Sequence, residues 1–119
     1  MNQTELLLNK IVEGLQEKKG KDIATVNISH VDGAICQYIV ICTGNTPTQV
    51  SALSDSVWEM VRKDLNEKPI AIDGERASEW IGLDYGTIIV HLFTPELRTY
   101  YDIENLWAGA KINLIPDLD

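Results

Sequence analysis

Apolar residues recur at helical spacing near the start of the chain. They occupy positions i, i+3, i+4 and i+7 of one stretch: Leu8, Ile11, Val12 and Leu15. This spacing predicts an amphipathic helix, which we expect Thr4 to cap and Gly20 to end.

A second helix is predicted from residue 46 onward. Thr46 can cap it, Pro47 suits the first helical position, and Gln49 can complete a capping box. Apolar residues then continue at helical spacing until Asn66 and Pro69 end the helix.

Shorter apolar runs predict β-strands. The predicted strands are 22–29, 38–42, 70–72, 80–83 and 87–93, with the last two forming a hairpin around Tyr85 and Gly86. Thr94 and Pro95 begin a last short helix. Residues 111–119 show no clear pattern, and we make no prediction of whether this segment is ordered. These elements predict one α/β domain over residues 1–119, with a single mixed sheet of about five strands and flanking helices.

Composition indicates an ordinary globular protein of 119 residues. The two cysteines, Cys36 and Cys42, are too far apart on one extended strand to bridge, so we expect buried thiols. No apolar run has the length of a membrane helix, and no signal peptide is visible. We therefore expect a cytoplasmic protein with neither a metal nor a cofactor.

The charge balance bears on which partners this chain can attract. Ten basic and 18 acidic residues give a formal charge of −8, which repels nucleic-acid backbones and attracts basic proteins. We therefore expect no direct sequence-specific nucleic-acid binding. The same charge also serves solubility, and charge alone favours this plainer interpretation.

The segment from Asp73 to Trp107 carries a family pattern. Its matching elements are Asp73-Gly74-Glu75, the run 80–86, the run 89–93, the run 98–101 and the run 104–107, with Thr43-Gly44 before the second helix. Together they resemble the ribosome silencing factor (Iojap-like) family over roughly residues 5 to 108.

This resemblance implies a specific function. Such factors are similar in fold to nucleotidyltransferases but lack that activity, and they form homodimers when free. They bind the large ribosomal subunit through its protein L-fourteen and obstruct joining of the small subunit. The result is less protein synthesis when nutrients are limiting.

The predicted hairpin and the loop before it offer the residues for partner binding. Trp80 supplies a large apolar area, and Asp84 and Glu75 can pair with basic side chains of a partner. Leu83 and Tyr85 complete the candidate surface, with Tyr85 expected to be exposed at the turn. The plainer interpretations are that Trp80 belongs to the core and that Asp84 only accepts hydrogen bonds within the turn.

Four other side chains are expected to serve packing. Tyr100, Tyr101 and Trp107 should pack the last helix on the sheet, and His91 should be a hydrogen-bonded residue of the core.

Two alternatives to ribosome binding remain. One is a metal-dependent nucleotidyltransferase, in which Asp73, Glu75 and Asp84 hold Mg²⁺ and the helix after Thr43-Gly44 holds a phosphate. Against it, the chain has no phosphate-binding loop motif and no basic residue soon after Gly44. The other is a dimeric adaptor with a different partner.

Overall fold

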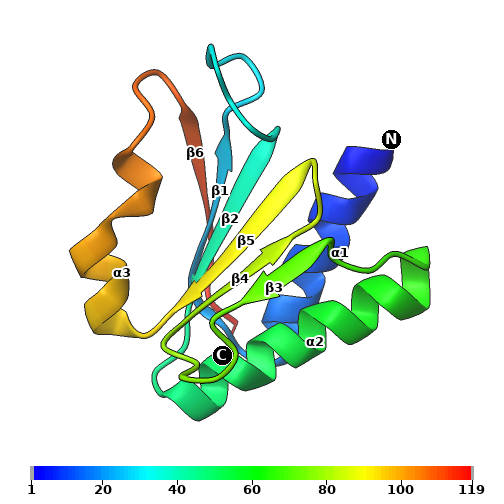
Figure 1. Ribbon diagram of the computed structural model, residues 1–119, viewed down its shortest axis with the longest axis vertical. Helices are drawn as coiled ribbons and strands as arrows, with labels where there is room; N and C mark the ends of the chain where they lie inside the picture. The colour runs from blue at the N-terminus through cyan, green and yellow to red at the C-terminus, as the bar shows by residue number, and fades with distance from the viewer. Residues whose placement is uncertain (1, 119) are drawn as a thin grey trace.

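The computed structural model describes residues 2–118, which form one six-stranded sheet with helices on both faces (Figure 1). The helices are α1 (Gln3–Glu17), α2 (Pro47–Leu65) and α3 (Pro95–Tyr101), followed by the 3-10 turn η1 (Ile103–Asn105). The strands are β1 (Lys21–Asn27), β2 (Tyr38–Thr43), β3 (Ala71–Asp73), β4 (Trp80–Asp84), β5 (Ile88–Phe93) and β6 (Lys111–Ile115).

The sheet is mixed, as predicted. Its order is β3-β4-β5-β2-β1-β6, in which β2 and β5 run parallel and the other neighbours run antiparallel. Helix α2 follows β2 onto one face of the sheet, whereas α3 follows β5 onto the opposite face (Figure 1).

Helix α2 begins and ends where the sequence predicts. The backbone N–H of Gln49 donates to Thr46 Oγ1 over 3.1 Å, and Asn66 ends the helix in the left-handed conformation. The Gln49 side chain accepts from the N–H of Asn45 over 2.7 Å, one residue before the usual partner in a capping box.

The cap of helix α1 lies two residues before the expected one. Asn2 caps it by accepting the N–H of Glu5 over 2.8 Å, so the prediction of Thr4 was wrong. Asn2 lies three residues before Glu5, which is the spacing that an N-terminal cap requires. Thr4 instead lies in the first turn.

The main core lies between the sheet and helices α1 and α2. Gly14 lets these helices approach closely, because a Cβ there would lie 3.1 Å from Val57 Cα. Ser56 Oγ donates to the Gly14 carbonyl oxygen over 2.7 Å across the same contact. The core includes Ile11, Leu15, Leu53, Val57, Leu83, Val90 and Leu92.

Strand β6 was not predicted from the sequence. It pairs antiparallel with β1 along its whole length, from Ile23 opposite Ile115 to Asn27 opposite Lys111. Most β6 side chains are exposed, including the apolar side chains of Ile112 and Leu114.

The second face of the sheet is only partly covered. Phe93, Ile103 and their neighbours form a smaller core beneath α3 and η1, and Trp107 packs against it as expected. Tyr100, however, is 77% exposed, so the prediction that it packs the helix on the sheet was wrong. Tyr101 is 42% exposed and packs against the ring of Trp80.

Candidate functional site

An open hollow of about 410 Å³ lies over β3, β4 and β5, on the sheet face opposite α1 and α2. Strand alternation explains which side chains reach it, because Ile81 and Leu83 point toward the helices and the residues between and beside them point away. The residues that line the hollow are Asp73, Gly74, Trp80, Gly82, Asp84, Ile89 and His91.

Gly82 lies at the centre of this hollow. In the sheet register it stands between Asp73 of β3 and His91 of β5. Trp80 and Asp84 flank it along β4 itself. Because glycine has no side chain, the floor of the hollow at this point is backbone.

Trp80 forms one wall of the hollow. Its ring stacks on Phe93 with centroids 5.1 Å apart and lies 4.4 Å from the ring of Tyr101. Its indole N–H donates to His91 Nδ1 over 3.0 Å. Trp80 is half-buried, so it packs on the smaller core and also lines the hollow.

The loop that enters β4 depends on Gly74. Gly74 has a φ of +87°, and a Cβ there would lie 1.9 Å from the carbonyl oxygen of Trp80. Only glycine fits this close approach without a shift of the backbone. Glu75, which follows it, is exposed in the loop but does not line the hollow.

Two carboxylates line the hollow. Asp73 is exposed at the end of β3. Asp84 is half-buried, and its Oδ1 accepts the N–H of Gly86 over 2.8 Å. Asp84 therefore both stabilises the turn and carries a negative charge at the hollow.

Leu83 and Tyr85 lie on the other side of the sheet. Leu83 is fully buried beneath the helices, so a partner of the folded chain cannot contact its side chain. Tyr85 packs against the same core with its hydroxyl oxygen buried, and the expectation that it is exposed was wrong. Burial raises the pKa of this hydroxyl well above its ordinary value.

His91 is hydrogen-bonded, as expected, but it is half-buried and lines the hollow rather than lying in the core. Burial lowers its pKa from the ordinary value of 6.5 to about 4, so the ring is neutral near pH 7. Because Nδ1 accepts the Trp80 N–H, the ring proton of the neutral form lies on Nε2. The hollow thus has a hydrogen-bond donor beside its two carboxylates.

We expect His91 to make the fold acid-sensitive. The unfolded chain takes up the proton first, so the contribution of His91 is complete above pH 6.5 and is lost as the pH falls to about 4. The lost free energy of unfolding amounts to about 3 kcal/mol at most. Urea unfolding at about pH 7 and about pH 4.5 measures it.

The matched control is His91→Gln, which retains an acceptor for Trp80 but does not titrate. This variant should lose less stability on acidification than the unaltered chain. Equal losses in both proteins would show that His91 does not cause the acid sensitivity.

The carboxylates proposed for the enzyme alternative do not converge. Asp73 and Asp84 line the hollow, but Glu75 does not. Within residues 2–118, no three His, Cys, Asp or Glu side chains lie where they can hold a metal ion together. The glycine at position 44, which the enzyme alternative placed before a phosphate-binding helix, is explained by packing. A Cβ there would lie 2.9 Å from the backbone nitrogen of Val50.

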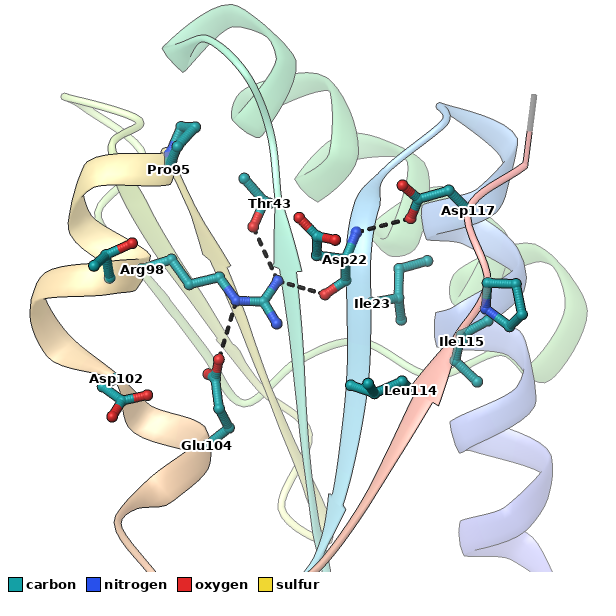
Figure 2. Close-up of a pocket in the computed structure, with 12 residues that line it drawn as sticks. Asp22, Ile23, Thr43, Pro95, Arg98, Asp102, Glu104, Leu114, Ile115 and Asp117 are labelled. Carbon is teal, nitrogen blue, oxygen red and sulfur yellow. Dashed lines mark hydrogen bonds and ion pairs between the residues drawn. The ribbon is translucent and has the colours of Figure 1, made fainter.

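A second hollow, of about 820 Å³, lies between α3, β1 and β6 (Figure 2). Arg98 extends across it, donating from Nε to Glu104 over 3.3 Å and from Nη1 to Thr43 Oγ1 over 2.9 Å. Nη1 also donates to the carbonyl oxygen of Asp22. Arg98 therefore connects α3 to two strands and to η1.

Sequence reasoning missed Gly82 and Arg98 as residues of these hollows. A glycine inside an apolar strand pattern was the available signal for Gly82, because such a glycine often marks a place where another group approaches the backbone. The contacts of Arg98 join residues far apart in the chain, and no local pattern reveals them.

Comparison with known proteins identifies the family. The profile described as "Ribosomal silencing factor during starvation" matches residues 1–119.

None of the helices within residues 2–118 is both long enough and apolar enough to span a bilayer.

Named relatives agree with this match. Ribosomal silencing factor RsfS of Chromobacterium violaceum is 36% identical over 84% of this chain and 80% of its own length. The factor of the same name from Bacillus subtilis is 29% identical over 100% of this chain and 96% of its own length. A mouse relative, "Mitochondrial assembly of ribosomal large subunit protein 1", is 26% identical over 85% of this chain and 45% of its own length.

A solved structure has the same fold. The crystal structure of a protein from Chromobacterium violaceum superposes with a TM-score of 0.83 and is 33% identical, covering 98% of this chain and 94% of that one. The resemblance predicted from the sequence is confirmed, and with it a ribosome-associated role in regulating translation. This chain belongs to the ribosomal silencing factor family.

Proposed function

We propose that this protein binds the large ribosomal subunit through its protein L-fourteen and sterically blocks joining of the small subunit. Protein synthesis then falls when nutrients are limiting. The observation that carries the proposal is the uncovered face of β3, β4 and β5, where Trp80 stands beside the carboxylates of Asp73 and Asp84.

The chemistry of this face suits a basic protein. Ribosomal proteins are commonly basic because they contact RNA, and a chain of charge −8 attracts them. The half-buried Trp80 offers an aromatic anchor whose position is fixed by Phe93 and Tyr101. A preformed anchor loses little conformational freedom on binding.

The names of the relatives support the large subunit as the partner. The mouse relative is named for assembly of the large ribosomal subunit, and the bacterial relatives are named for ribosomal silencing. Binding that covers the joining surface of the large subunit connects these two descriptions.

Co-sedimentation tests the choice of partner. The protein should pellet with isolated large subunits and remain in the supernatant with small subunits. An adaptor that acts elsewhere in the cell would remain in the supernatant with both, and this outcome would contradict the proposal.

We also propose that the free protein is a homodimer. The family resemblance alone supports this state, and analytical ultracentrifugation at micromolar concentration tests it. A dimer is the expected result, and a monomer throughout that range would refute it.

A further inference from the structure

We propose that the hollow over Gly82 receives an arginine side chain of the partner protein. This inference rests on the proposed function for the identity of the partner, and it adds the chemistry of the group that docks.

The shape of the hollow comes from a missing side chain. Gly82 has neighbours on four sides in the sheet: Asp73, His91, Trp80 and Asp84. A Cβ at Gly82 would meet only the carbonyl oxygen of Val90, at 4.0 Å, and Gly82 does not have a positive φ. The fold therefore does not require glycine here, and any side chain would project into the hollow.

The groups around Gly82 suit a guanidinium ion. Asp73 and Asp84 supply negative charge on two sides, and the ring of Trp80 supplies an aromatic wall. A guanidinium ion is planar, stacks on aromatic rings and donates several hydrogen bonds to carboxylates, so it matches this set better than the compact ammonium of lysine. The Nε2–H of His91 can donate to a carbonyl oxygen of the same partner residue.

The first test measures affinity for large ribosomal subunits. Gly82→Val fills the hollow and should weaken binding by about tenfold or more, while the melting temperature is maintained. Gly82→Ala, the smaller change, should weaken binding less. The matched control is Asn113→Val, which adds a branched side chain at an exposed position of β6 and should bind like the unaltered protein.

A double variant tests whether charge and shape act on one group. Asp73→Asn should weaken binding, but Gly82→Val combined with Asp73→Asn should bind about as well as Gly82→Val alone, since both changes act on the same arginine. Asp55→Asn removes an equal charge from an exposed position of α2 and should have little effect. The inference would be overturned if Asp73→Asn weakened binding of the Gly82→Val variant by the same factor as it weakens binding of the unaltered protein. It would also be overturned if Gly82→Val bound large subunits as tightly as the unaltered protein.

A second test does not depend on the ribosome. N-acetyl-arginine amide should shift the NMR signal of the Trp80 indole N–H, and the neutral citrulline analogue should not. The indoles of Trp58 and Trp107 are internal controls. If the unaltered protein fails to bind large subunits, the proposed function is wrong, but this titration still tests the hollow. A Trp80 signal that does not shift on addition of N-acetyl-arginine amide would contradict the inference that the hollow binds arginine.

Discussion

Replacing Asp84 with lysine is expected to weaken binding to the large ribosomal subunit about a hundredfold or more. Asp84 lines the hollow beside Trp80 and Gly82, so the substitution places a positive charge where a basic partner docks. Like charges at an interface cost several kcal/mol, whereas loss of one attraction costs less. Equilibrium binding of labelled protein to isolated large subunits measures the change.

Two further variants separate charge from structure. Asp84→Asn retains an oxygen that can accept the N–H of Gly86, so the turn remains, and binding should fall by about tenfold. Asp55→Lys makes the same charge reversal on an exposed position of α2 and should bind nearly as well as the unaltered protein. If Asp55→Lys weakened binding as strongly as Asp84→Lys, net charge rather than the hollow would explain the effect.

Arg98→Met is expected to lower the free energy of unfolding by about 3–5 kcal/mol. Arg98 and Glu104 form an ion pair whose side chains are only 13% and 20% exposed. Methionine removes the cation that pairs with the mostly buried Glu104 carboxylate (Figure 2). The bonds to Thr43 and to the Asp22 carbonyl are lost as well.

Urea unfolding of a double variant identifies the cause of this loss. Arg98→Met combined with Glu104→Met should be more stable than Arg98→Met alone, because the unpaired carboxylate is gone. Lys10→Met, which removes a surface ion pair with Glu13 and Asp64, should cost much less. A double variant no more stable than the single one would show that the buried charge is not the main cost.

Local patterns predicted the helices and most strands, because caps and periodicity act over a few residues. Thr46, Pro47 and Asn66 bound α2 as their chemistry requires. Strand β6 escaped prediction because its pairing with β1 joins residues more than eighty positions apart. The alternation of Ile112 and Leu114 with polar residues is a local signal, but it covers only a short run.

The candidate site was predicted in part. Trp80 and Asp84 line the hollow, but Leu83 and Tyr85 were grouped with them by nearness in the chain. Alternation along β4 places Leu83 on the helix side, and Tyr85 packs there too. Gly82 was missed because its contribution is the space left by an absent side chain, and that space exists only once β3 and β5 flank β4.

Light scattering during subunit association tests the central claim most directly. Large subunits preincubated with excess protein should join small subunits to a much lower extent, whereas large subunits preincubated with Asp84→Lys should join them normally. Full joining in the presence of the unaltered protein, while co-sedimentation shows it bound to the large subunit, would contradict the proposal that this protein acts by occupying the joining surface.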